Sequence, residues 1–310
     1  MPNQRRTSTR TVVLVVVLVY ALLGTLAAAA VATNTFEAGY RLNGLAERVR
    51  LALDPPPDRE ILPVFEITET SSKGGASEPE GFSNRQPTER QPEDTTRPRK
   101  KAVDVKLRAN PNRTFAHQAT KDWCAVAGTQ MVLAMHGIVD NSEGAQRRIA
   151  GRIDEWESWR DSKNGGWGPS AMAQALADHG LEGYQIRSYG SRQLALRDAA
   201  VAIKQTRAPV ILLAWRGAHT WVMTGYRAKA DPETFPKARI TGAYIYDPWY
   251  PWISSIWGPS DPPGTFQDEA EMERNFLRWQ RPEGTYENRD GKFLAIVPTV
   301  PLSEQRATRS

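Results

Sequence analysis

The apolar positions of the sequence divide it into an apolar N-terminal run, a polar middle and a patterned C-terminal half. Residues 11–36 contain no charged side chain, and residues 12–32 are apolar except for Tyr20, Gly24 and Thr25. About 20 apolar residues are enough for a helix to span the hydrocarbon core of a membrane. We therefore predict a transmembrane segment at residues 11–36.

The charges that flank this segment predict its orientation. Arg5, Arg6 and Arg10 precede it, so the positive-inside rule leaves residues 1–10 in the cytoplasm and sends the rest of the chain across the membrane. Two interpretations remain open: a signal-anchor that stays in place, which the length of the run favours, or a signal peptide cut after the small residues 30–32. The predicted location is a single-pass membrane protein with an extracytoplasmic C-terminal domain, or alternatively a secreted protein.

The polar middle, residues 37–108, is predicted to be a juxtamembrane helix followed by a disordered linker. Residues 37–53 have helical periodicity, and the prolines at 55–57 end it because proline lacks the amide proton. From Asp58 to Arg108 the composition turns to Pro, Ser, Thr, Glu, Arg and Gly, with residues 61–67 as a short apolar island. Such a stretch buries too little apolar surface to offset the entropy lost on ordering.

The C-terminal half, residues 109–302, is predicted to be one domain, followed by a disordered tail at residues 303–310. Apolar positions three and four apart predict helices that start at Asp122 or Trp123 and at residues 142–159, 170–179 and 191–205. Residues 184–189 look like a strand, and after residue 205 the apolar pattern changes to that of a sheet, which predicts strands at residues 209–215, 219–227, 239–246 and 292–298. Helices first with an antiparallel sheet after them indicate the α+β class.

Composition removes several function classes. The formal net charge is +5, and the basic residues are scattered apart from four between positions 97 and 101, so we expect no nucleic-acid partner. The single cysteine, Cys124, excludes an internal disulfide and a cysteine-based zinc cluster, and we predict neither a metal nor a cofactor. An unpaired thiol in an exported protein needs an explanation, which is either burial or chemistry.

Three residues fit the requirements of a thiol hydrolase. Cys124 lies in the first turn of a predicted helix, where unpaired amides and the helix dipole stabilise a thiolate. His219 opens a predicted strand, where a rigidly held imidazole can transfer a proton. Asp247 ends the next strand, so a hairpin would place it at the same edge as His219, where it can orient the ring. Taken singly, each could instead be structural: a buried thiol, a core histidine and a turn aspartate.

The other histidines have structural explanations. His136 and His179 precede glycines at predicted helix ends, where carbonyl groups can satisfy them. His117 lies next to Gln118 and could reach the site. A further group of large aromatic side chains flanks the His219 and Asp247 segments; we expect most of them in the core and the rest along a cleft for a peptide or glycan: Trp215, Trp221, Trp249, Tyr250, Trp252 and Trp257.

Taken in order, these segments resemble the C39-like peptidases of the papain superfamily. Residues 118–124 are similar to the family's glutamine-to-cysteine block, residues 217–222 to its histidine block and residues 245–248 to its Asp-Pro block. The resemblance covers about residues 110–298. It implies a papain-like fold, in which N-terminal helices pack on an antiparallel sheet.

The resemblance also implies the role of each site residue. Cys124 would be the nucleophile, His219 the base and Asp247 the orienting residue. Gln118, six residues before the cysteine, would donate its side-chain amide to the oxyanion. The implied enzyme is a cysteine peptidase that acts on a peptide or protein substrate.

Departures from the family pattern keep two alternatives open. Ala125 follows Cys124 where exporter-type members usually have glycine, and the sequence shows neither a P-loop nor a six-helix transporter segment. Peptide export is therefore not expected. Leader-cleaving exporter domains face the cytoplasm, whereas this domain is predicted outside it, so the resemblance does not imply cleavage after a double-glycine leader and leaves the substrate open. The alternatives are a hydrolase of peptidoglycan stem peptides and a catalytically silent binding module on the same fold.

Overall fold

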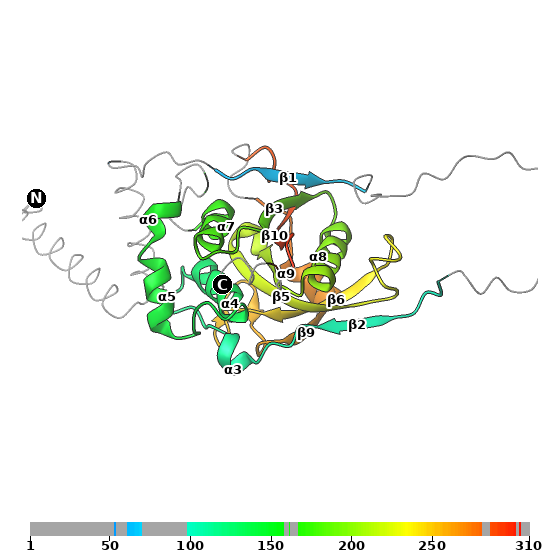
Figure 1. Ribbon diagram of the computed structural model, residues 1–310, viewed down its shortest axis with the longest axis horizontal. Helices are drawn as coiled ribbons and strands as arrows, with labels where there is room; N and C mark the ends of the chain where they lie inside the picture. The colour runs from blue at the N-terminus through cyan, green and yellow to red at the C-terminus, as the bar shows by residue number, and fades with distance from the viewer. Residues whose placement is uncertain are drawn as a thin grey trace, which may run out of the picture. The chain divides into compact units, whose positions relative to one another are not determined.

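A mainly antiparallel sheet runs through the computed structural model, with helices on both of its faces (Figure 1). The structure describes residues 53, 61–69, 98–157, 161, 167–280, 286–301 and 304. All of these except Leu53 belong to one compact unit, Asp58–Ser162 with Gly166–Ser310.

Within the described residues, eight strands make up this sheet in the order β1-β3-β10-β4-β5-β6-β9, and β2 pairs with the second half of β5. Neighbours are antiparallel except β1 and β3, which are parallel. The strands are β1 (Val64–Ile67), β2 (Val103–Lys106), β3 (Tyr184–Tyr189), β4 (Val210–Ala214), β5 (His219–Ala228), β6 (Ile240–Tyr246), β9 (Thr265–Asp268) and β10 (Phe293–Pro298). A separate short hairpin consists of β7 (Ile253–Ser254) and β8 (Gly258–Pro259).

The helices begin where side chains can cap them. Ser142, Ser191 and Asp268 accept hydrogen bonds from backbone amides in the first turns of α5, α8 and α9, which satisfies donors that a helix start leaves free. The helices are α3 (Pro111–Thr114), α4 (Cys124–Met135), α5 (Glu143–Ala150), α6 (Ile153–Trp156), α7 (Pro169–Asp178), α8 (Arg192–Thr206) and α9 (Glu269–Asn275).

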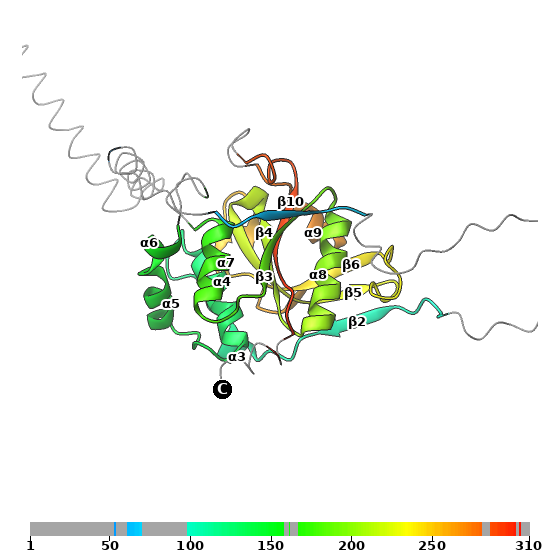
Figure 2. The same cartoon turned by 45° about the horizontal axis from the view of Figure 1, so that its top comes forward.

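The two faces of the sheet bury separate apolar clusters. Figure 2 shows α4 and α7 on one side of the strands and α8 on the other. Along β4, Ile211 and Leu213 pack with α4 and α7, whereas Val210 and Leu212 pack with α8. Burial on both faces explains why this strand is an unbroken apolar run rather than an alternating one.

Most elements agree with the sequence-based predictions, and the predicted α+β class is confirmed as a mixed fold with a mainly antiparallel sheet. The predicted helix at 142–159 is wrong in its continuity, because α5 ends at Ala150 and α6 begins at Ile153. Between them, Arg152 has φ −101° and ψ 12°, which is outside helical geometry.

The prediction of a disordered linker up to Arg108 is wrong for two of its segments. Val64–Ile67 forms β1 against β3, and Val103–Lys106 forms β2 against β5. Leu62 and Val64 also pack on the core, so partners distant in the sequence supply the burial that the local composition lacks. The described part of the domain therefore begins near residue 61 rather than at 109.

Several predictions lie outside the described residues. These are the cytoplasmic segment 1–10, the transmembrane segment 11–36, most of the stretch 37–108 and most of the tail 303–310. In the part of the chain that the structure describes, no helix has the length and apolar character needed to cross a membrane.

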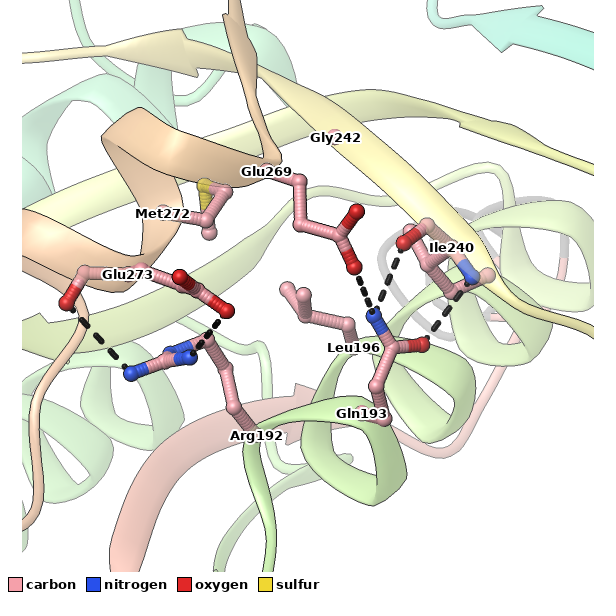
Figure 3. A pocket seen from close by; sticks show the side chains of 8 residues that line it. All are labelled: Arg192, Gln193, Leu196, Ile240, Gly242, Glu269, Met272 and Glu273. Atoms are coloured by element: carbon pink, nitrogen blue, oxygen red, sulfur yellow. Dashed lines mark hydrogen bonds and ion pairs between the residues drawn. The ribbon is translucent and has the colours of Figure 1, made fainter.

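Polar side chains join α8 to β6 and α9 (Figure 3). The Gln193 amide donates to the Ile240 carbonyl at 2.9 Å and accepts from the Ile240 amide at 3.0 Å. Arg192 donates to the Phe276 carbonyl at 2.9 Å and pairs with Glu273 at 3.5 Å. The Gln193 bonds fix the start of β6, the strand whose far end leads to Asp247, and the Arg192 bonds fix α9.

Candidate active site

Cys124 is the first residue of α4, and its side chain is half-buried. No side chain caps this helix start, so the first amides of α4 are available to an anion. The sulfur lies 3.9 Å from the carbonyl oxygen of Ala218, the residue before His219. The nucleophile candidate therefore lies against the start of β5.

His219 is the first residue of β5 and follows an unusual turn. Trp215, Arg216 and Gly217 all have positive φ, at 49°, 61° and 83°. A Cβ on Gly217 would lie 2.3 Å from the Trp279 ring, so both its backbone conformation and its surroundings require glycine. This turn reverses the chain between β4 and β5 and sets the position of the imidazole.

Asp247 follows the last residue of β6, and the β5–β6 pairing brings it to His219. Its Oδ1 accepts from His219 Nε2 at 2.7 Å and from the Trp249 amide at 2.8 Å. Its Oδ2 accepts from Ser260 Oγ at 2.8 Å. Since Nε2 is used by the carboxylate, Nδ1 is the nitrogen that remains for Cys124.

Both members of this pair are buried, and each stabilises the charged form of the other. Burial lowers the pKa of His219, but the Asp247 carboxylate and the contact with Cys124 outweigh it and raise the pKa to about 9. Burial raises the pKa of Asp247, yet His219, the Trp249 amide and Ser260 together hold it below its ordinary value. An imidazolium beside a cysteine favours the thiolate over the thiol.

Aromatic rings surround His219. Trp215 stacks on the imidazole with centroids 3.9 Å apart, and Trp249 meets its edge at 6.2 Å. The contacts continue outward, since Trp257 stacks on Trp215 at 5.6 Å and Trp252 meets Trp249 at 5.2 Å. Of the aromatic group noted in the sequence, Trp215 and Trp221 are buried, whereas Trp249, Tyr250, Trp252 and Trp257 are partly exposed.

Gln118 lies in the loop before α4, fully buried. Its backbone amide donates to the Pro248 carbonyl at 3.0 Å, which ties this loop to the residue after Asp247. Its side-chain Nε2 donates to the carbonyls of Thr120 and Lys121, at 2.8 and 3.0 Å. To donate to an oxyanion, the Gln118 amide would therefore have to break one of these two hydrogen bonds.

The other histidines make structural contacts. His179 Nδ1 lies 2.7 Å from the Ala175 carbonyl, as expected at a helix end, and His136 Nε2 lies 3.2 Å from the Tyr184 hydroxyl. His117 Nδ1 lies 2.7 Å from the Tyr250 carbonyl and 3.2 Å from that of Pro248. His117 thus fastens the loop after Asp247 to the loop before Cys124.

Sequence reasoning missed two groups that hold the Asp247 carboxylate, the Trp249 amide and the Ser260 hydroxyl. The Trp249 amide could have been found, because an aspartate before proline commonly accepts from the amide two residues on. Ser260 follows Asp247 by 13 positions, and no pattern marks it.

A second buried cluster of charges lies elsewhere, at the start of α7. Arg289 pairs with Asp161 at 2.6 Å, and Asp161 Oδ2 also accepts from the amides of Ser170 and Ala171. Glu157 accepts from the Gly168 amide at 3.0 Å, and burial together with the neighbouring Asp161 raises its pKa to about 9. No group of three or more histidine, cysteine or acidic side chains suited to a metal ion occurs within the described residues.

Comparison with protein families gives a match over the C-terminal half. The family model described as Peptidase_C39 like family matches residues 110–281, which is more than half of the chain. The matched range begins just before α3 and includes Gln118, Cys124, His219 and Asp247. Among curated proteins, none matches the sequence.

Proposed function

This chain belongs to the Peptidase_C39-like family, and we propose that it is a papain-like thiol hydrolase that cleaves peptide bonds. The observation that carries the proposal is the line of contacts from Cys124 through His219 to Asp247, with the histidine and the aspartate joined at 2.7 Å. In this arrangement Nε2 of His219 is bonded to the Asp247 carboxylate, which leaves Nδ1 for Cys124. Cys124 is the only cysteine in the sequence.

Each residue then has one task in the reaction. The Cys124 thiolate attacks the carbonyl carbon of the peptide bond, and the carbonyl oxygen becomes an oxyanion. The imidazolium of His219 gives its Nδ1 proton to the leaving amine, which leaves a thioester on the sulfur. Neutral His219 then takes a proton from water, whose oxygen attacks the thioester and releases the acid and the thiolate. Asp247 keeps the ring in the orientation in which Nδ1 faces the sulfur.

Two sets of donors can stabilise the oxyanion. The free amides in the first turn of α4 lie beside the sulfur, and a helix start favours negative charge. Gln118 is the second donor that we propose, by releasing its side-chain amide from Thr120 or Lys121 as substrate binds. Hydrogen bonds of catalytic groups are often rearranged in this way between the free enzyme and its complex.

Alkylation of the single thiol tests the proposal. Iodoacetamide should label the native protein rapidly at pH 7, where His219, with a pKa of about 9, carries its proton. Because there is one cysteine, mass spectrometry reports Cys124 directly, and Cys124→Ala is the blank. Labelling should slow sharply in His219→Ala and less in Asp247→Asn. A thiol that reacts only after unfolding, or equally fast without His219, would contradict the proposal.

We also propose that the domain acts outside the cytoplasm, on the strength of the uncharged residues 11–36 and the preceding arginines. Protease added to intact cells should digest the domain, while a cytoplasmic marker protein survives. A domain that is protected until the cells are broken would contradict this location. Release of a soluble form beginning near residue 33 would indicate a signal peptide rather than an anchor.

A further inference from the structure

The segment after Asp247 is unusual in its composition. Residues 248–260 contain no charged side chain, in a protein with 24% charged residues. The segment includes the β7–β8 hairpin, on which Ile253 is 74% exposed and Ile256 is 79% exposed. In the part of the chain that the structure describes, four large apolar side chains are exposed, and two of them are these isoleucines.

Both sides of this hairpin are attached to the candidate triad. Before β7, Trp252 contacts Trp249, whose amide binds the Asp247 carboxylate. After β8, Ser260 donates its hydroxyl proton to the same carboxylate. Trp257, near the start of β8, stacks on Trp215, and Trp215 stacks on His219. The hairpin is therefore held against Trp215, the ring that stacks on the imidazole.

The exposed isoleucines and the partly exposed tryptophans all lie within residues 248–260, the segment whose Trp257 stacks on Trp215 next to His219. Single exposed apolar side chains are common, but a grouped set indicates a contact with a partner. We infer that the β7–β8 hairpin is a wall of the substrate site and selects peptides with a bulky apolar side chain near the cleaved bond. This inference rests on the proposed peptide-bond hydrolysis.

Charge argues for a peptide rather than a membrane surface on this hairpin. A segment that lies on an anionic membrane usually carries lysine or arginine, whereas residues 248–260 have none and the charged residues at their ends are Asp247 and Asp261. Isoleucine side chains also offer no hydrogen bond to the hydroxyl groups of a glycan. An apolar side chain of a peptide fits both the composition of the hairpin and its contact with the reactive groups.

A library of quenched fluorescent peptides, with each position fixed in turn, tests the inference. The wild-type protein should cleave peptides with Leu, Ile or Phe at one position near the cut about tenfold faster than peptides with Asp or Lys there. The double variant Ile253→Ser, Ile256→Ser should lose most of this preference. Ile253→Lys, Ile256→Lys should move it toward Asp and Glu. Phe65→Ser, at an exposed apolar position on the edge strand β1, is the matched control and should keep the wild-type preference.

Iodoacetamide labelling of the same variants separates the two proposals. If labelling depends on His219 but the peptide preference is the same in the serine variant, the hairpin inference is wrong and the proposed chemistry stands. If labelling is fast but no peptide is cleaved, the inference is likewise wrong. If labelling does not depend on His219 and no peptide is cleaved, both proposals fail. Loss of binding to phosphatidylcholine–phosphatidylglycerol vesicles in the serine variant, with an unchanged peptide preference, would make the hairpin a membrane contact instead.

Discussion

Two buried clusters of charged side chains, His219 with Asp247 and Arg289 with Asp161, differ in what surrounds them. Around Asp161, one carboxylate oxygen binds Arg289 and the other binds the amides that start α7. Both oxygens of this carboxylate are therefore bonded within the cluster. Around Asp247, the bound imidazole also interacts with Cys124, whose side chain is half-exposed. Burial and ion pairing are common to both clusters. A half-exposed thiol next to the pair distinguishes the candidate site from the structural one.

The largest effect is expected at the sulfur. Cys124→Ala should lower peptide hydrolysis by at least about 10⁴-fold, because the residues of a triad act as a unit. The free energy of unfolding should change by less than about 1 kcal/mol, since the half-buried side chain loses one atom. Steady-state hydrolysis and urea unfolding measure the two quantities. Residual hydrolysis within tenfold of the wild type would remove Cys124 from the mechanism.

The second effect is expected at Arg289, where stability should fall and hydrolysis should be nearly unchanged. Arg289→Met leaves Asp161 buried without its cation, so stability should fall by about 3–5 kcal/mol in urea unfolding. Hydrolysis per folded molecule should stay within about threefold. Arg147→Met, in a pair with Glu143 that is 60% exposed on both sides, is the matched control and should cost less than about 0.5 kcal/mol. Equal losses in the two variants would mean that the buried cluster has no special structural role.

The third effect is expected at Gln118. Gln118→Ala should lower kcat about a hundredfold, equivalent to roughly 3 kcal/mol, and leave KM nearly unchanged if the amide binds the oxyanion mainly in the transition state. Initial rates over a range of peptide concentrations separate the two constants. An unchanged kcat with a raised KM would make Gln118 a ground-state contact. Loss of stability alone would limit its role to its bonds with Thr120 and Lys121.

The smallest effect is expected at Glu157 and depends on pH. Its pKa is about 9 in the folded protein against an ordinary 4.5, so the folded state holds the proton more strongly and stability falls as pH rises from 4.5 to 9. Glu157→Gln removes this dependence, so its stability relative to the wild type should rise as the pH goes from 5 to 8.

The wild type and Glu157→Gln should share a second loss of stability. The pKa of His219 is also raised, from 6.5 to about 9, so its contribution is complete below pH 6.5 and is lost as pH rises toward 9. Urea unfolding at pH 5, 6.5, 8 and 9 gives the free energy of unfolding as a function of pH for both proteins. Parallel profiles over the whole range would show that Glu157 does not titrate as proposed.

The sequence predicted those parts of the molecule whose partners are close along the chain. The apolar positions marked β3, β5 and α8 to within about one residue, because each element buries most of its apolar side chains. The hairpin of β5 and β6 follows from their proximity, and it is this pairing that brings Asp247 to His219.

The parts that the sequence did not predict depend on distant partners. β1 is stabilised by β3, about 120 positions later, and the composition around it gives no sign of that pairing. Arg289 and Asp161 are 128 positions apart. The hydrogen bonds of the Gln118 amide to Thr120 and Lys121 join residues that are close in the sequence, yet they were not predicted. The resemblance to a family matches residue types and gives no side-chain geometry.

The pairing of β1 and β2 with the sheet decides how the domain can be detached from whatever precedes it. Beyond its ladder with β3, β1 is held by Lys292 through Glu66, and Glu69 pairs with Arg197. A single proteolytic cut between residues 70 and 97 would therefore leave the upstream piece bound to the domain without a covalent link. Shedding of the hydrolase would need a cut before Leu62 or the dissociation of β1.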